Sequence, residues 1–168
     1  MLGTLQILAV LLVVIVLTPA LAHALELPGK MQLGKDEYLI VQQIYYPGFT
    51  IVGVAEPVGI LSLLLLVFIT PSGTAFWLTL GAFLALLLVH LLYWMLTHPV
   101  NNFWLADFKL AGLGARFFGA APFGRSKAGA QSPTLDWMTL RDRWEHSHVA
   151  RAALAMLSLI LLVTAVAL

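Results

Sequence analysis

Four long apolar stretches dominate the pattern of hydrophobic and polar positions along the chain. They cover about residues 4–24, 49–70, 75–97 and 145–168. A helix needs roughly 20 mainly apolar residues to cross the core of a bilayer, so each stretch predicts a membrane-spanning helix. Turn residues at Pro71–Gly73 predict that the second and third helices form an antiparallel hairpin. The pattern therefore predicts an all-α fold, a single membrane domain over residues 1–168 built as an up-down bundle of four transmembrane helices.

The first apolar stretch and the connection after it raise two further expectations. The sequence "ALAHA" has small residues at the spacing of a signal-peptide cleavage site, but a basic segment before the stretch is missing, so we interpret it as a retained span. In the following connection, residues 25–48, Asp36 and Glu37 favour a helix start, and three tyrosines suit the lipid headgroup layer. This connection predicts a short helix that lies along the membrane interface.

The second long connection, residues 98–144, is rich in Gly, Ala and Phe, and turn residues predict a helix start near Thr134 or Asp136. All lysines and arginines fall on the side of the two connections: Lys30, Lys35, Lys109, Arg116, Arg125, Lys127, Arg141, Arg143 and Arg151. The positive-inside rule then predicts that both connections are cytoplasmic. Both termini are expected on the non-cytoplasmic side of an inner or plasma membrane.

Composition supports a membrane protein and excludes several functional classes. Apolar residue types make up 61% of the chain and charged types only 10%, whereas soluble domains have about a quarter charged residues. The net charge of +1 gives no basic surface for nucleic acid. The chain has no cysteine, which excludes disulfides, thiolate nucleophiles and cysteine-based metal sites. The bilayer is therefore the first expected partner.

Polar residues gather at one depth of the predicted bundle, near its cytoplasmic end. All four predicted helices contribute to this set, whereas the other half of the bundle is almost entirely apolar. We call the set the polar layer: His23, Glu26, Glu56, His90, His98, Asn101, Asn102, Glu145, His148 and Arg151. Insertion scales give a cost of about 2.5–3.5 kcal/mol for a charged group at the centre of a membrane helix, so such groups face the bundle interior and pair.

Two local patterns refine the polar layer. At about 100° per residue, one face at the start of the last helix carries a polar stripe, and His146 points to the other side. The stripe consists of Arg141, Trp144, Glu145, His148 and Arg151. In the second helix, Glu56 is followed by Pro57, which predicts a kink that frees a backbone carbonyl near the carboxylate.

A metal site is the first interpretation of the polar layer. His23 and Glu26, and likewise Glu145 and His148, are three residues apart and put two ligands on one helix face, and Glu56 offers another carboxylate. Two Glu/His pairs with further carboxylates are typical of di-iron bundles. The first pair has the reverse order, however, and a neighbouring arginine would repel a cation. Ion pairs among the same side chains explain the pattern equally well.

A pocket for a hydrophobic aromatic or quinone-like compound is the second interpretation. Buried Glu and His side chains are suited to proton transfer, so Glu56 or His148 is the expected proton acceptor. Arg151 with Asn101 would stabilise an enolate or phenolate oxygen. Aromatic residues would supply the walls, although an interfacial aromatic belt explains some of them: Tyr93, Trp94, Phe103, Trp104 and Trp144.

A structural role is the third interpretation. The polar layer would hold four helices together, and the protein would be a small non-catalytic subunit of a larger membrane complex or a homo-oligomer. His90 alone could also bind haem, but a lone histidine does not establish a haem site. The cofactor therefore stays open between none and a metal ion in the polar layer.

Three stretches carry a resemblance to a known family. These are "AHALELPGK" at Ala22–Lys30, "THPVNNFWL" at Thr97–Leu105 and "DWMTLRDRWEHSHVARAAL" at Asp136–Leu154, and Val41–Gly59 fits with them. Together they resemble the DUF1772, or anthrone oxygenase-like, family of small membrane proteins, with residues 111–133 as an apparent insertion. The resemblance implies a four-helix membrane bundle and an oxidoreductase acting on reduced polycyclic phenols such as anthrones, without metal or flavin. The positions that match the family motifs are Asn101, Trp144, His148 and Arg151.

Overall fold

The computed structural model describes residues 2–46, 48–104 and 136–168, and these residues form helices without a strand. The elements are α1 (Leu2–Lys30), α2 (Lys35–Gln42), the 3-10 helix η1 (Gln43–Tyr45), α3 (Gly48–Val52), α4 (Ala55–Ile69), α5 (Thr74–Leu92), the π-helix η2 (Tyr93–Thr97), α6 (His98–Trp104) and α8 (Trp137–Ala167). The prediction of an all-α fold is confirmed for this part of the chain.

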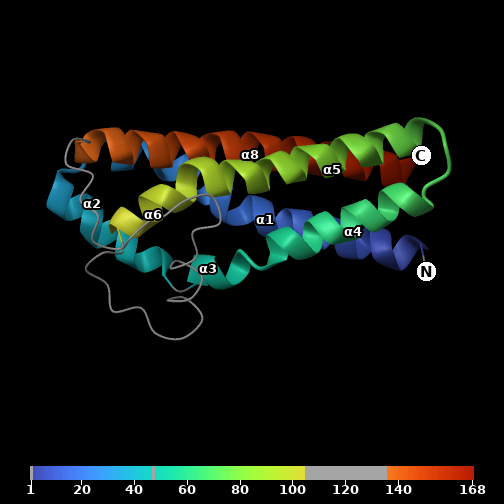
Figure 1. Cartoon of the computed structure of the whole chain (residues 1–168), viewed down its shortest axis with the longest axis horizontal. Helices are drawn as coiled ribbons and strands as arrows, with labels where there is room; N and C mark the ends of the chain where they lie inside the picture. Colours follow the sequence, from blue (N-terminus) through green and yellow to red (C-terminus); the bar gives the residue numbers. More distant parts are fainter. Residues whose placement is uncertain (1, 47, 105–135) are drawn as a thin grey trace.

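Four helices pack side by side as a bundle. α1 contacts α4 and α8, and α5 contacts the same two helices from the other side, so the four form a ring around a common core. Figure 1 shows both termini at one end of the bundle and α2 and α6 at the other. The connections 25–48 and 98–144, which are predicted to lie on the same side of the membrane, therefore both begin at the end of the bundle away from the termini.

Three helices are long and apolar enough to cross a membrane among the residues that the structure describes. They are α1, the continuous helical stretch Thr74–Asn101, and α8. α4 has 15 residues, about 22 Å at 1.5 Å per residue, which is less than the roughly 30 Å of a bilayer core. The chain thus has the character of an integral membrane protein, and the fourth span stays a prediction.

The second apolar stretch is interrupted in the turn before Pro57, as the predicted kink requires. The break lies at Gly53 and Val54, whose backbone N–H groups bond to carbonyls of α3. The Gly53 carbonyl accepts from the Glu56 N–H, so it is not left free as predicted. Pro57 lies in the first turn of α4, where backbone N–H groups have no intrahelical acceptor, so its missing N–H is tolerated there. Glu56 precedes it in the same turn, at the positive end of the helix dipole.

The first and last helices extend beyond their predicted bounds. α1 continues to Lys30, six residues past the predicted end, and α8 begins at Trp137 with Asp136 at its N-cap position. The predicted interfacial helix corresponds to α2, which has Asp36 and Glu37 in its first turn. The remainder of the long connection, residues 105–135, lies outside the described residues, and with it the apparent insertion at 111–133.

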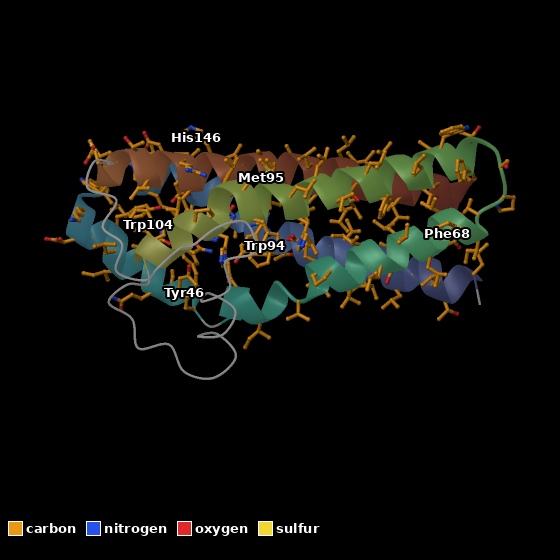
Figure 2. The ribbon with its side chains drawn as sticks, in the orientation of Figure 1. Tyr46, Phe68, Trp94, Met95, Trp104 and His146 are labelled. Carbon is orange, nitrogen blue, oxygen red and sulfur yellow. The ribbon has the colours of Figure 1, made fainter. Side chains whose placement is uncertain are left out.

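The bundle has an apolar core and an aromatic end. The core joins all four long helices through Val13, Leu63, Leu86 and Ala155. The other cluster lies where α2, η1, α6 and the start of α8 meet, and Figure 2 shows its members Tyr46 and Trp104 near that end of the bundle. This aromatic cluster covers the polar layer at the end of the bundle away from the termini: Tyr38, Tyr45, Val100, Trp104 and Trp144 with Tyr46 packed against them.

Candidate functional site

The polar stripe of α8 faces the bundle interior, as its helical periodicity predicts. Its five residues are buried, whereas His146 is exposed and lies on the outer side of α8 in Figure 2. The most deeply buried ionisable group of the stripe is Glu145, with an exposed fraction of 0%. A carboxylate at such a place needs a partner, and the structure supplies one from α1.

We call the first group of interacting residues the Lys30 cluster: Lys30, His23, Glu26, Glu145, Tyr38 and Tyr45. The Lys30 ammonium lies 2.9 Å from His23 Nδ1, 3.0 Å from Glu26 Oε2 and 3.4 Å from Glu145 Oε1. Because an ammonium only donates hydrogen bonds, His23 Nδ1 is the acceptor. Lys30 is 3% exposed. The sequence did not indicate this role, because α1 extends six residues past its predicted end and so brings Lys30 into the polar layer.

Two tyrosines close the Lys30 cluster from the side of α2 and η1. The Tyr38 hydroxyl donates to Glu145 Oε1 at 2.8 Å, and the Tyr45 hydroxyl donates to Glu26 Oε2. Burial, together with these carboxylates, raises the pKa of both hydroxyls above the ordinary tyrosine value. Both tyrosines therefore stay protonated and act as donors at any physiological pH.

We call the second group the Glu56 cluster: Glu56, Arg151, His90 and Trp94. Arg151 Nη2 donates to Glu56 Oε2 at 2.7 Å, and His90 Nδ1 lies 2.8 Å from Glu56 Oε1. Trp94 Nε1 donates to His90 Nε2 at 3.0 Å, so the hydrogen of the neutral ring sits on Nδ1 and points to the carboxylate. His90 thus faces the site, a point that the uniformly apolar sequence of α5 could not decide.

His148 lies between the two clusters. Its ring centroid is 4.2 Å from that of His23 and 4.3 Å from that of Trp144. Arg151 Nη1 makes a long contact of 3.4 Å to His148 Nδ1, which must accept because a guanidinium only donates. His148 Nε2 then carries the hydrogen. This Nε2 and Arg151 Nε are buried without a hydrogen-bond partner in the described part of the chain.

Asn101 is connected to the other predicted site residues through the Trp144 ring. Its Oδ1 accepts from Trp144 Nε1 at 2.7 Å and from the Tyr46 hydroxyl at 3.3 Å. The Trp144 ring lies 4.3 Å from that of His148. Glu56, His148 and Arg151 are linked by direct contacts, and among the described residues no hydrogen bond joins Asn101 to Arg151 itself.

The metal interpretation finds no support in the geometry of the predicted ligands His23, Glu26, Glu145 and His148. Within the described ranges, no group of three or more His, Asp or Glu side chains is arranged to hold a metal ion. The physical reason is Lys30, whose ammonium already stands among His23, Glu26 and Glu145 at 2.9–3.4 Å. Zinc needs ligands at about 2.0–2.2 Å. The chain supplies its own cation at this place.

A π-helical turn, η2, follows α5 beside the site. Such turns are frequent at functional sites because they shift side chains relative to a regular helix. Here Arg143 Nη2 donates to the Met95 carbonyl at 2.7 Å, and Thr97 and Ser147 share a hydrogen bond of 2.8 Å between η2 and α8. The Arg151 guanidinium lies 5.1 Å from the ring centre of Tyr93. The sequence pattern did not predict this π-helical turn.

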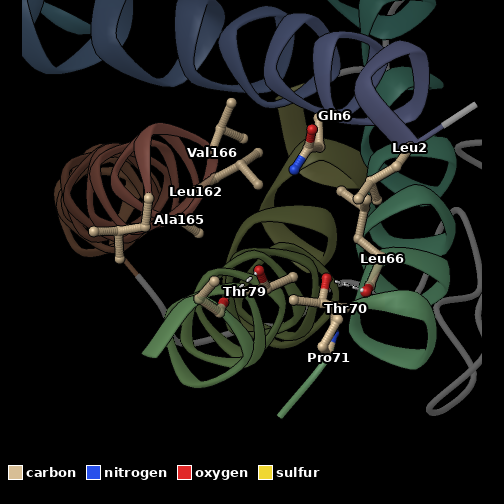
Figure 3. A pocket seen from close by; sticks show the side chains of 11 residues that line it. Leu2, Gln6, Leu66, Thr70, Pro71, Thr79, Leu162, Ala165 and Val166 are labelled. Carbon is tan, nitrogen blue, oxygen red and sulfur yellow. Dashed lines mark hydrogen bonds between the residues drawn. The ribbon is translucent and has the colours of Figure 1, made fainter. Parts of the chain in front are cut away.

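A separate cleft of about 170 Å³ lies at the opposite end of the bundle, near both termini. Figure 3 shows side chains from α1, α4, α5 and α8 around it, with Gln6, Thr70 and Thr79 among mainly apolar neighbours. Thr70 and Thr79 direct their hydroxyls to carbonyls of their own helices. The cleft contains no residue of the polar layer and is therefore distinct from the candidate site.

Comparisons with known proteins assign no family to the chain. No family model matches it. No curated protein and no solved structure matches it either. The function is therefore inferred from the site residues and their contacts.

Proposed function

We propose that the chain is an integral membrane protein that binds a hydrophobic aromatic or quinone-like compound in the polar layer, and that it oxidises a reduced compound of this class with dioxygen: one oxygen atom is transferred to a ring CH2 carbon and the other leaves with the two hydrogens as water. This proposal rests on two buried polar groups, His148 Nε2 and Arg151 Nε, that have no hydrogen-bond partner among the described residues. Buried polar atoms are hydrogen-bonded in the great majority of proteins, and a group left unpaired costs about 1–3 kcal/mol. A carbonyl or phenolate oxygen of a ligand would satisfy both donors.

The surroundings of His148 suit an aromatic ligand. Rings of His23, Trp144 and Tyr45 lie against one another here, with the Tyr45 centroid 4.3 Å from that of His23. Flat side chains of this kind pack on the faces and edges of other rings. The hydrogen on His148 Nε2 makes it a donor to the ligand oxygen. Glu56 is ion-paired with Arg151, which in turn contacts His148. We assign Glu56 as the proton acceptor in this proposal.

A resemblance to the anthrone oxygenase-like family supports oxidation as the reaction. Its motif positions Trp144, His148 and Arg151 lie together in the structure, and Asn101 is bonded to Trp144. These are the contacts expected if the motif residues serve one site. The same resemblance supports four membrane spans, with α3 and α4 together forming the second one.

The ligand proposal is tested by binding in lipid nanodiscs. The probe is 9-fluorenone, a flat aromatic ketone with one acceptor oxygen, titrated by calorimetry with empty nanodiscs as the background. We expect His148→Ala to weaken binding by up to about tenfold, since the one hydrogen bond from Nε2 to the ligand is lost. His146→Ala is the matched control, because His146 lies two residues away on the exposed face. The proposal fails if His148→Ala and Glu56→Gln leave binding and turnover of all tested phenols and quinones unchanged.

Membrane topology is tested by cysteine labelling, which is clean because the chain has no cysteine. Single substitutions are placed at Gly3, Ser72 and Lys35, all exposed in the bundle. With four spans and cytoplasmic connections, an impermeant maleimide added outside labels Gly3→Cys and Ser72→Cys but not Lys35→Cys. Labelling of Gly3 and Ser72 from opposite sides would show that the second stretch, or the first, does not span.

A non-catalytic role within a larger membrane complex is the second candidate. The observation in its favour is that the carboxylates of the polar layer are paired inside the chain: Glu145 with Lys30 and Tyr38, and Glu56 with Arg151 and His90. Such pairs can hold helices together without any ligand. This role predicts stable co-purification with larger partners and unchanged probe binding in polar-layer variants.

A further inference from the structure

The side chain of Gln42, at the end of α2, is a buried polar group outside the Lys30 and Glu56 clusters. Gln42 is 1% exposed, yet its Nε2 and its Oε1 both lack a hydrogen-bond partner in the described part of the chain. An amide can take part in up to four hydrogen bonds. A leucine of similar size would fill the same space without this desolvation penalty. The buried Gln42 amide therefore needs hydrogen-bond partners that the described residues do not provide.

Gln42 lies on the face of α2 and η1 that carries two residues of the Lys30 cluster. Tyr38 lies four residues before it and Tyr45 three residues after it, so the three share one face of α2 and η1. Both tyrosines reach into the bundle, where they bond to Glu145 and Glu26. This face is thus the one that packs on α1 and α8, and Gln42 lies between its two anchoring tyrosines.

A continuous series of rings leads from this face to His148. Tyr45 contacts His23 at 4.3 Å between ring centroids, and His23 contacts His148 at 4.2 Å. Trp144 lies against both imidazoles, at 4.7 Å and 4.3 Å. Tyr45, on the same helical face as Gln42, is thus linked by ring contacts to His148, and Gln42, His148 and Arg151 all have buried polar atoms without a partner among the described residues.

The chemistry of an amide specifies what it can recognise. Oε1 accepts a hydrogen bond and Nε2 donates one, so the pair complements a group that does both. A phenolic hydroxyl donates through its hydrogen and accepts through its oxygen, whereas a ketone only accepts. We propose that Gln42 is a specificity-determining residue that binds a hydroxyl group of the ligand, and that α2 forms one wall of the site. This inference rests on the proposed function.

The experiment compares two probes that differ by one hydroxyl, 9-fluorenone and 2-hydroxy-9-fluorenone, in nanodiscs. The wild-type chain is expected to bind the hydroxylated probe about tenfold more tightly, as two hydrogen bonds to a buried amide provide. Gln42→Leu is expected to remove this preference, so that the two probes bind with the same Kd. Gln43→Leu is the matched control, because Gln43 is the exposed neighbour and has the same chemistry.

A second readout separates ligand recognition from a structural role. Without ligand, Gln42→Leu is expected to raise Tm by about 2–4 °C, because it removes an unpaired buried amide. A fall in Tm would mean that the amide is satisfied within the protein, and it would overturn the inference, as would a hydroxyl preference that survives in Gln42→Leu. If His148→Ala binds both probes like the wild type, or if the wild type binds neither, the proposed function itself fails.

Discussion

Replacing Lys30 with methionine tests the charge balance of the polar layer most directly. The substitution keeps most of the aliphatic stem and removes the ammonium that lies 3.4 Å from Glu145. With an effective dielectric constant of about 20, the Coulomb energy of that pair is about 5 kcal/mol. The variant leaves a carboxylate with 0% exposure facing only the Tyr38 hydroxyl. Removing one partner of a buried pair costs about 3–5 kcal/mol, and we expect a loss of that size.

The pair Glu26–Lys30 adds less, because the Glu26 side chain is 40% exposed and water screens its charge. The free energy of unfolding is measured by titration with sodium dodecyl sulfate in mixed micelles. Glu145→Gln and the double variant Lys30→Met/Glu145→Gln complete a double-mutant cycle. The double variant is expected to be more stable than Lys30→Met, since no unpaired charge remains inside. A loss below about 1 kcal/mol for Lys30→Met, or a double variant that is less stable still, would refute this account.

Three further predictions concern packing, metal and pH. Gly59→Leu is expected to destabilise the fold by about 1–3 kcal/mol in the same titration, because even a Cβ atom at this position would lie 3.3 Å from Leu86 Cδ2. The control is Gly29→Leu, because a Cβ atom at Gly29 has no neighbour within 4 Å. Dialysis against a chelator is expected to leave Tm unchanged because Lys30 stands among the candidate ligands, and a chelator-dependent fall would restore the metal interpretation. The raised pKa of Tyr38 means that its contribution to stability is complete below pH 10 and is lost above it, where the unfolded chain ionises first. Melting curves between about pH 9 and 11 should show a smaller decline in Tyr38→Phe.

Helical periodicity was a reliable guide wherever polar residues marked one face of a helix. It placed the stripe of α8 in the interior and His146 outside, which the structure confirms. Composition and segment length likewise indicated apolar helices suited to a bilayer, and three such helices are present in the described residues. These features depend on burial of side chains along one helix, so they can be read from local sequence.

The hydrogen-bond and ion-pair partners within the polar layer could not be predicted from helical periodicity, because they depend on contacts between helices. Lys30 was assigned to a connection, although α1 continues through Pro28 and delivers it to Glu145. His90 sits in a stretch that is apolar on all sides, so only tertiary packing against Glu56 shows which way it faces. Gln42 carried no sequence signal beyond an amide in a polar connection, and its burial is a result of tertiary packing.

The distance along the chain between paired charges has a consequence for biosynthesis. Lys30 and Glu145 are separated by 115 residues, so the ribosome finishes α1 long before it makes the partner carried by α8. At about 5–20 residues per second, the delay is roughly 6–23 s. During this interval Lys30 has one of its two carboxylate partners, Glu26, which lies one turn away in α1. A chain released before α8 is complete would lack Glu145, the buried partner, which gives membrane quality control a physical signal for an unfinished product.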